Sequence, residues 1–205
     1  MIRTDPGSEV STESGAETRT GPGAKKARLV YLMGASGVGK DTLLGEVRRH
    51  RPEWLVAHRY ITRPSGASEN CVGLSQDEFD WRRRLGLFCL DWHAHGFDYG
   101  LGIEIPAWLE RDQLVIVNGS RRALATAREH FGERLLPVLV TARPSVLRER
   151  LIRRGRETRD EIEARLRRHQ QLEATLDGIA RIDNSRELRH TVAALQALLV
   201  TECPA

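Results

Sequence analysis

One glycine-rich segment constrains this chain more than any other feature, because it lies between an apolar run and an amphipathic stretch. The apolar run at 29–33 is typical of a buried strand, and residues 41–50 have the periodicity of a helix. Glycines let the backbone turn tightly and approach a ligand, so amide groups and the positive end of the helix can bind phosphate. The segment therefore predicts a loop that binds nucleotide phosphates, formed by Gly34, Ala35, Ser36, Gly37, Val38, Gly39, Lys40, Asp41 and Thr42.

Lys40 is the only lysine after residue 26, since the chain otherwise uses arginine. A flexible ammonium group can follow a phosphoryl group as it is transferred, which predicts a catalytic role for Lys40. The next position, usually Ser or Thr for magnesium, is Asp41, and the hydroxyl comes one residue later in Thr42. Asp41 could bind the ion through water, or Thr42 could bind it. The sequence thus predicts ATP and Mg²⁺ as cofactors, with these two residues as candidate metal ligands.

Strand-like and helical stretches alternate after the loop, which predicts an α/β domain whose parallel sheet is covered by helices on both faces. We expect strands at 55–60, 87–90, 114–117, 135–140 and 179–182, and helices at 105–111, 121–131, 145–154, 161–176 and 188–199. Residues 62–102 break this alternation with short strands and a capping box at Ser75-Gln-Asp-Glu78. They indicate an insertion that holds the acceptor substrate.

The first 26 residues are rich in Gly, Ser, Thr and Glu, which predicts a disordered tail before a domain that spans 27–205. No stretch approaches the roughly 18 apolar residues of a membrane span. The three cysteines are odd in number and not in CxxC spacing, which fits a reducing cytoplasm better than disulfides or zinc. The net charge of +4 is spread along the chain without a recognition motif, so we expect anionic small molecules rather than nucleic acid as partners.

Ten arginines lie within residues 143–168. A charge run is most often a solvated helix face, and we expect that of about half of them. Phosphoryl transfer passes through a loose, highly charged transition state, however, and arginines are well suited to stabilise it. We therefore predict a lid at 150–160 that closes over the nucleotide, with a cluster of arginines at positions 150, 153, 154 and 156. The catalytic candidates are Arg153, Arg156 and Arg165.

The chain resembles the guanylate kinase fold over nearly all of residues 28–200. The glycine loop is similar to the phosphate loop of that fold, and the other matching motifs are Thr62-Arg63-Pro64 for the acceptor phosphate, Leu90-Asp91-Trp92 with Tyr99-Gly100 for the acceptor pocket, and Arg153-Arg-Gly-Arg156 for the lid. The resemblance implies a P-loop NTPase-type parallel sheet flanked by helices, with an acceptor-binding insertion and a lid.

One segment of this chain differs from guanylate kinases, and the difference indicates a particular family of the same fold. Guanylate kinases carry an acidic Leu-Asp-Ile-Asp segment that helps to hold the base, whereas this chain has Val117-Asn-Gly-Ser-Arg121. Together with 40–44, 56–63 and 68–70, this segment resembles the ribose 1,5-bisphosphate phosphokinase family of phosphonate catabolism. The resemblance implies a cytoplasmic enzyme that uses ATP to convert ribose 1,5-bisphosphate into 5-phosphoribosyl 1-diphosphate, and it leaves a homodimer open.

The same resemblance implies the acceptor-binding residues. Arg59 and Arg63 would clamp phosphate, since a guanidinium group can bind it with two parallel hydrogen bonds. Histidines could donate to the second phosphate and a tyrosine hydroxyl could bind a phosphate oxygen, while an aspartate could hold ribose hydroxyls or merely an arginine. These further candidates are His58, Asp91, His95, Tyr99, Asn118 and Arg121, and of them His58 and Tyr99 could equally be strand or core residues.

Two other functions stay open. A guanylate kinase or another nucleoside monophosphate kinase would share the loop and the lid, but it needs acidic groups for the base. A catalytically silent binding module of the same fold would be free to lose Lys40, which this chain keeps. The acceptor pocket decides between the first alternative and a bisphosphate kinase.

Overall fold

The computed structural model describes residues 28–66, 69–155, 157–174, 176 and 178–202, so the tail predicted at 1–26 lies outside it. Its strands are β1 (Leu29–Met33), β2 (Leu55–Val56), β3 (Arg59–Ile61), β4 (Cys71–Gly73), β5 (Phe88–Ala94), β6 (Phe97–Gly102), β7 (Val115–Asn118), β8 (Leu135–Thr141) and β9 (Ala180–Asp183). Its helices are α1 (Lys40–His50), α2 (Gln76–Arg84), α3 (Glu104–Leu109), α4 (Leu124–Phe131), α5 (Pro144–Arg154), α6 (Arg159–Ala174) and α7 (Leu188–Glu202), with short 3-10 turns at Arg121–Ala123 and Gly132–Arg134.

Five strands form a central sheet in the order β2-β7-β1-β8-β9, and every neighbouring pair is parallel. Strand β1 lies in the middle, where Leu29 pairs with Val115 on one side and with Leu135 on the other. All five of its residues are buried. The predicted parallel α/β sheet is confirmed, with a continuous apolar run in its central strand, as expected for a strand covered on both faces.

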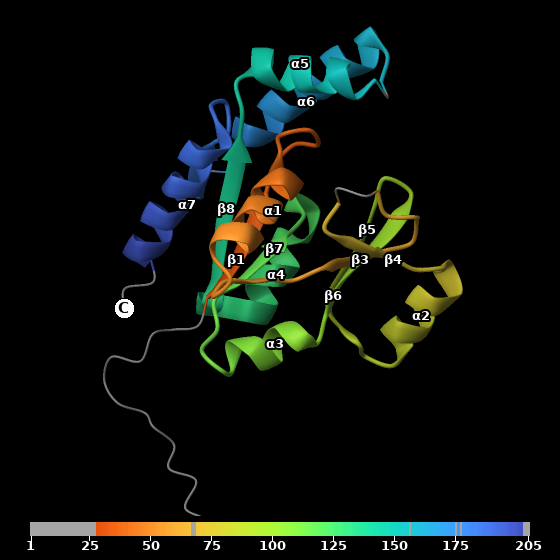
Figure 1. Cartoon of the computed structure of the whole chain (residues 1–205). Coiled ribbons are helices and arrows are strands. Elements are labelled where there is room, and N and C mark those ends of the chain that lie inside the picture. Colours follow the sequence, from red (N-terminus) through yellow and green to blue (C-terminus); the bar gives the residue numbers. More distant parts are fainter. Residues whose placement is uncertain (1–27, 67–68, 156, 175, 177, 203–205) are drawn as a thin grey trace, which may run out of the picture.

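The two faces of the central sheet carry different layers. Leu29, Tyr31 and Met33 point into a core that includes side chains of α3, α4 and the second sheet described below, whereas Val30 and Leu32 point into a core with α1, α5, α6 and α7. Figure 1 shows these helices against the sheet, with α5 and α6 extending beyond the upper end of β8. The period-two alternation of side chains in β1 thus anchors both layers.

A second sheet, in the order β4-β3-β6-β5, stands beside the first and carries α2 on its outer side (Figure 1). Its pairs are antiparallel except for β3 with β4. Helix α2 begins at the predicted capping box, where the Ser75 hydroxyl accepts a hydrogen bond from the Glu78 amide at 3.1 Å. The region predicted as an insertion is therefore a small sheet with one helix.

The run at 55–60 is not the single strand that we predicted. The Ala57 amide donates to Ile116 of β7 in the central sheet, but the Arg59 amide donates to the carbonyl of Asn70 at the start of the second sheet. The hydrogen-bonding partner changes within two residues, so the run is divided between β2 and β3. Periodicity alone carries no information about such a change of sheet.

The other predicted helices and strands are present with shifts of a few residues at their ends. Helix α5 ends at Arg154 and is capped by Gly155, whose φ of 67° is in the left-handed region that favours glycine. Among the described helices, none combines the length and the apolar content needed to cross a bilayer.

Candidate active site

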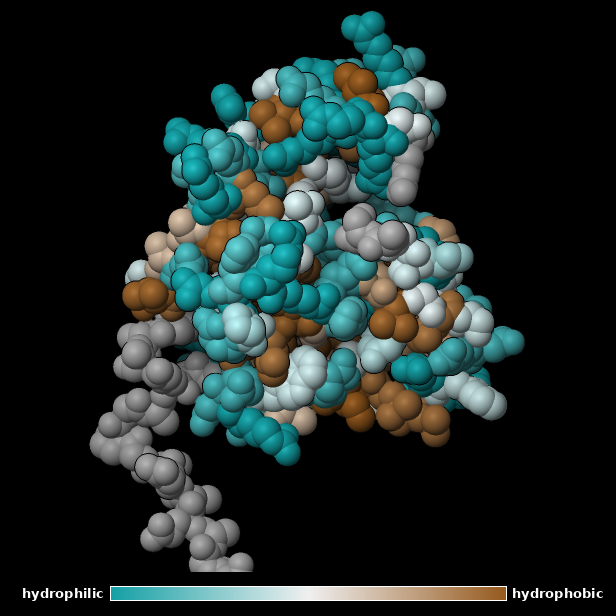
Figure 2. All heavy atoms as spheres, in the orientation of Figure 1, coloured by the Kyte–Doolittle hydropathy of each residue, from teal (hydrophilic) through white to brown (hydrophobic). Residues whose placement is uncertain are grey.

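A cleft of about 1270 Å³ opens at the carboxyl ends of β1 and β7, between the glycine loop and the second sheet. In the space-filling view the surface is notched between the upper part of the molecule, formed by α5 and α6, and the second sheet (Figure 2). Ligand sites of open parallel sheets usually lie at this edge, where loops from several strands meet.

The glycine loop is shaped by close packing against its neighbours. A Cβ atom on Gly34 would collide with the carbonyl oxygen of Val140, and one on Gly39 would come within 2.5 Å of Asn184 Nδ2. Gly39 also has a φ of 96°, in the left-handed region. Larger residues at either position would push the loop away from the sheet, which explains the glycines without reference to a ligand.

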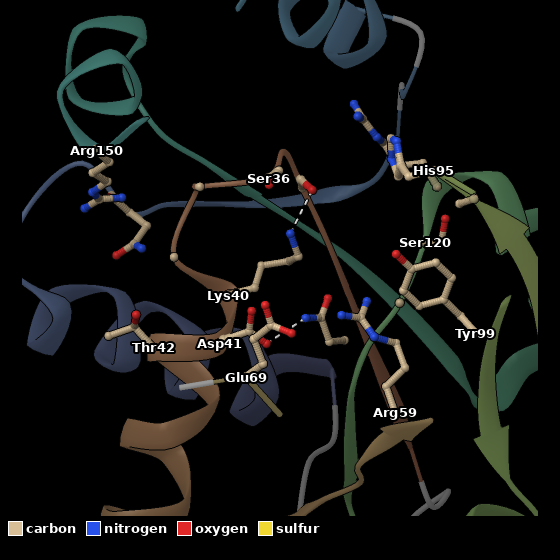
Figure 3. Close-up of a pocket in the computed structure, with 18 of the residues that line it drawn as sticks. Ser36, Lys40, Asp41, Thr42, Arg59, Glu69, His95, Tyr99, Ser120 and Arg150 are labelled. Carbon is tan, nitrogen blue, oxygen red and sulfur yellow. Dashed lines mark hydrogen bonds between the residues drawn. The ribbon is translucent and has the colours of Figure 1, made fainter. Parts of the chain in front are cut away.

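Lys40 is held by the loop itself. Its Nζ donates to the carbonyl of Gly34 at 2.8 Å (Figure 3). It also donates to the carbonyl of Ala35 at 3.1 Å. The pKa of Lys40 is lowered to about 8, chiefly by burial; the Asp41 carboxylate opposes this shift, and the positive charges of Arg59 and Arg121 add to it. The ammonium group is thus a charge in a partly desolvated, positively charged site, which favours binding of an anion.

Two more networks fix the surroundings of the loop. Asn184, at the end of β9 and 3% exposed, donates from Nδ2 to the Val38 carbonyl at 2.8 Å and accepts from Thr191 Oγ1 at 2.7 Å. Arg150 of α5 donates to the same Val38 carbonyl at 3.1 Å and to the Asn184 carbonyl at 2.8 Å. Helices α5 and α7 are therefore tied to the glycine loop.

The turn after β7 is positioned by Tyr31 of β1. The Tyr31 hydroxyl donates to the Ser120 carbonyl at 3.0 Å and accepts from the Ser120 amide at 2.9 Å. Gly119 lies against the ring, where a Cβ atom would collide with it. Burial raises the pKa of Tyr31 to about 12, so it is a neutral structural group.

The second sheet brings two arginines to the opposite wall. The Arg59 guanidinium lies 5.0 Å from the centre of the Tyr99 ring and donates to Cys71 Sγ at 3.4 Å. Arg63 pairs with Glu69 at 2.9 Å. Trp92 is 8% exposed and stacks on Tyr99 with ring centroids 5.5 Å apart, so its main role is packing.

His95 reaches the cleft from a tight hairpin. It and Gly96 connect β5 to β6 with φ values of 54° and 76°. Two consecutive positive φ angles are typical of the type I′ turn, whose twist matches that of the flanking strands. This turn places His95 and Tyr99 along the same wall (Figure 3).

The structure brings most of the predicted site residues together. Those that line the cleft are Gly34, Ser36, Gly37, Gly39, Lys40, Asp41, Thr42, Arg59, Arg63, His95, Tyr99, Asn118 and Arg121. Ala35 and Val38 are buried in the loop and take part through their carbonyls.

Two predicted acceptor residues lie outside this lining. The His58 ring contacts Arg48, with 3.2 Å between its Nε2 and the guanidinium Nη2. Asp91 accepts from Arg83 Nε at 2.9 Å on the outer face of β5. The alternation of side chains in that strand explains the second case, because Trp92 and Ala94 face inward and Asp91 therefore faces outward.

The lid arginines are also placed differently from the prediction. Arg153 does not line the cleft, Arg165 pairs with Glu157 at 3.1 Å, and Arg156 lies outside the described residues. Arg150 and Arg154 line it instead, and Arg154 Nη1 donates to Ser36 Oγ at 3.3 Å. These two are four residues apart and share one face of α5. Spacing alone does not select them, because Arg150 and Arg153 also lie on neighbouring turns of the helix.

Several lining residues were not predicted as site residues, namely Glu69, Ala94, Gly119, Ser120, Arg122, Leu176, Asn184, Arg186 and Leu188. Asn184 and the residues after it could have been found, because they follow a strand of the parallel sheet. The lining is strongly positive: among the described residues it holds one lysine and seven arginines, against the carboxylates of Asp41 and Glu69.

The positive charges of the site also affect the pKa of a buried histidine in α6. His169 of α6 is 4% exposed. Its pKa is lowered to about 4, chiefly by burial and in part by the positive charges of Arg121 and Lys40. The imidazole is therefore neutral at pH 7.

The oxygen atoms of the site suit magnesium better than a transition metal. The described residues contain no group of three or more His, Cys, Asp or Glu side chains arranged to hold a metal. Mg²⁺ is usually bound by one or two carboxylates together with substrate phosphates and water. Asp41, with the amide oxygen of Asn118 and the hydroxyl of Thr42 in the same cleft, fits that pattern.

Comparison with known proteins gives a consistent result. No protein-family model matches the sequence. The chain is similar to curated proteins named "Ribose 1,5-bisphosphate phosphokinase PhnN". That of Burkholderia mallei is 51% identical over 176 residues, covering 84% of this chain and 95% of the relative. Those of Yersinia pestis and Pectobacterium parmentieri are 47% and 46% identical over 181 and 175 residues, covering 87% and 84% of this chain and 94% and 93% of the relatives.

Among solved structures, guanylate kinase from Anaplasma phagocytophilum matches with a TM-score of 0.66, covering 88% of each chain. The sequence identity is 17%, so this match concerns the fold alone. It confirms the predicted guanylate-kinase-like architecture.

Proposed function

This chain belongs to the ribose 1,5-bisphosphate phosphokinase family, and from that membership we propose that it transfers the terminal phosphoryl group of ATP to the 1-phosphate of ribose 1,5-bisphosphate. The products are 5-phosphoribosyl 1-diphosphate and ADP. A cytoplasmic location, a homodimer and a role in phosphonate catabolism stay predictions.

The charge of the acceptor wall carries this proposal. Arg59, Arg63, Arg121 and Arg122 line the cleft, and the end of β7 and the turn after it offer Asn118 and Ser120 rather than carboxylates. Glu69 is the remaining acid on that wall, and Arg63 neutralises it. A wall of this kind favours an acceptor with two phosphates over one with a single phosphate and a neutral base.

The chain's own residues act mainly by position and charge. A phosphate acceptor is already ionised at neutral pH, so it needs no strong general base, and the difficulty is to bring two anions together. We propose that Arg59 and Arg63 hold the acceptor, while the amides of the glycine loop hold the nucleotide. Lys40 would exchange its bonds to Gly34 and Ala35 for phosphate oxygens.

Arg150 and Arg154 approach the loop from α5, where they can stabilise charge on the group in transfer. Bound Mg²⁺ would neutralise the β- and γ-phosphate oxygens of ATP. Closure of α5 and α6 toward the second sheet would exclude water, which prevents loss of the phosphoryl group by hydrolysis.

A coupled assay of ADP release tests the proposal. With ATP and Mg²⁺, we expect kcat/KM for ribose 1,5-bisphosphate to exceed that for GMP by at least about 100-fold, which corresponds to roughly 3 kcal/mol of contacts to the second phosphate. Ribose 5-phosphate is the matched control, since it lacks the phosphate that accepts the transfer. Preference for GMP would instead make this a nucleoside monophosphate kinase, and no turnover with any acceptor would favour the silent binding module.

A further inference from the structure

The glycine loop and the neighbouring strand carry an unusual pair of residues. P-loop NTPases generally hold Mg²⁺ with a Ser or Thr directly after the loop lysine and with an Asp at the end of an adjacent strand. Here the loop position is Asp41, and β7, the strand paired with β1, ends in Asn118. The carboxylate has moved from the strand to the loop, and a neutral amide stands at the end of the strand.

The two side chains are in direct contact. Asn118 pairs in register with Leu32, which brings it next to the loop, and its Nδ2 donates to Asp41 Oδ1 at 3.0 Å (Figure 3). Figure 3 shows Asp41 next to Lys40, whereas Thr42 lies apart from it toward Arg150. Asp41 rather than Thr42 is therefore the loop residue that acts together with the end of β7.

The second atom of the Asn118 amide points to a ligand. Asn118 is 2% exposed and lines the cleft, and its Oδ1 accepts no hydrogen bond from any described residue. A buried carbonyl oxygen without a donor is costly, so a ligand is expected to satisfy it. An amide oxygen beside a carboxylate is a pair of hard oxygen donors, the kind that Mg²⁺ prefers.

Charge explains why the exchange can preserve function. The usual hydroxyl and carboxylate contribute one negative charge, and so do Asp41 and Asn118. Two carboxylates at this short separation would repel each other, and the bond from Asn118 Nδ2 to Asp41 would be lost. The amide at the end of the strand is thus the natural complement of an acid in the loop.

We propose that Asp41 and Asn118 together hold the Mg²⁺ of the bound nucleotide, with the acid and the neutral oxygen exchanged between loop and strand. The inference rests on the proposed function for its nucleotide, but not for its acceptor. Asn118 becomes a metal ligand in this proposal, and Asp41 binds the metal together with Asn118. The earlier choice between Asp41 and Thr42 is thereby replaced by the pair of Asp41 and Asn118.

Nucleotide binding measured by calorimetry, without any acceptor, tests this proposal. The quantity of interest is the ratio of ADP affinities with Mg²⁺ and with EDTA. We expect Asp41→Ser to reduce that ratio at least tenfold while affinity in EDTA stays the same or rises, and Asn118→Leu to reduce it several-fold. The exposed Asp77→Ser on α2 is the matched control and should leave the ratio unchanged.

The decisive variant carries both Asp41→Ser and Asn118→Asp, which restores the usual order of hydroxyl and acid. Asp41→Ser lowers the ratio of ADP affinities with Mg²⁺ and with EDTA, and we expect the double variant to recover more than half of that loss on a logarithmic scale. A merely structural role of the two residues does not produce such a rescue. The proposal is wrong if Asp41→Ser keeps the wild-type ratio, or if the double variant binds ADP normally in EDTA and recovers none of the loss.

A second measurement avoids variants altogether. With Mn²⁺ in place of Mg²⁺, pulsed electron paramagnetic resonance of the wild-type ADP complex should show coupling to ¹³C in the side chains of Asp and Asn. Absence of that coupling also contradicts the proposal. If wild-type protein bound no ADP at all, the kinase function itself would fail, whereas a failure confined to the acceptor would leave the metal result intact.

Discussion

The glycine loop and the second sheet face each other across one cleft, yet they are built in different ways. The loop is a single contiguous segment whose shape is fixed by backbone contacts, with Gly34 against Val140 and the Val38 carbonyl held by Arg150 and Asn184. The acceptor wall is assembled from side chains of several strands, such as Arg59 of β3 and Tyr99 of β6. Backbone contacts tolerate few substitutions, while a wall of side chains can be changed residue by residue.

The largest expected effect is on the loop. Replacing Lys40 by Ala removes the ammonium group bound to Gly34 and Ala35, and we expect kcat to fall by about 1000-fold, as for loss of a principal electrostatic group. KM for the acceptor should change little, because Arg59 and Arg63 are intact. Steady-state kinetics with both substrates checks this, and near-normal kcat would contradict the assigned role of the loop.

The next effect is on the opposite wall. Arg59→Ala should raise KM for ribose 1,5-bisphosphate by about 10- to 100-fold, since hydrogen bonds to charged groups contribute about 1.5–3 kcal/mol. KM for ATP should stay within a few-fold. Arg82→Ala is a suitable control, because this arginine lies over Tyr60 and pairs with Glu78 outside the cleft. An increase in KM for ATP instead would mean that the two walls do not divide the substrates as proposed.

A smaller effect tests the support behind the loop. Thr191→Val keeps the shape of a fully buried side chain but removes the hydrogen bond to Asn184 Oδ1. We expect about a 5- to 10-fold rise in KM for ATP, the equivalent of roughly 1–1.4 kcal/mol for a buried acceptor left without its donor. Thr191→Ser keeps the hydroxyl, so KM for ATP should stay close to the wild-type value. Equal effects of both substitutions would show that packing, not the hydrogen bond, matters at this position.

The smallest effect is expected at Asp91. Its carboxylate pairs with Arg83 on the outer face of β5, so Asp91→Asn should change kcat and both KM values by less than about twofold. Steady-state kinetics is again the measurement. A tenfold increase in KM for the acceptor would return Asp91 to the acceptor site and redraw the boundary between the two walls.

The same contrast explains how far the sequence could be interpreted. The strand, glycine loop and helix around Lys40 were predicted because their residues are adjacent in the sequence, and the parallel sheet followed from the alternation of strands and helices. The inward or outward direction of Asp91, and the contact of His58 with Arg48, depend on strand direction and on where the chain changes sheet. Those facts are set by distant pairing, which local patterns do not encode.

The lid shows an intermediate case. A cluster of arginines was predicted at 150–160, and Arg150 and Arg154 of α5 line the cleft. The choice of Arg154 over Arg153 depends on which face of α5 meets the loop, and the sequence does not give that face. Asn184 was missed because its one signal in the sequence is its position after a strand of the parallel sheet, and the prediction did not use that signal. Asn184 supports the loop through its hydrogen bonds with Val38 and Thr191. Val38 is distant in the sequence, and Thr191 belongs to no recognisable motif.

The division of the run at 55–60 between two sheets has a mechanical consequence. The chain passes from the hydrogen bonds of β2 to those of β3 through Ala57 and His58, and two residues span at most about 7 Å. This short link allows little change in the distance between the surface that binds the phosphoryl donor and the surface that binds the acceptor. Side chains of the second sheet could therefore be replaced to accept another sugar or nucleotide, while the distance over which the phosphoryl group is transferred stays the same.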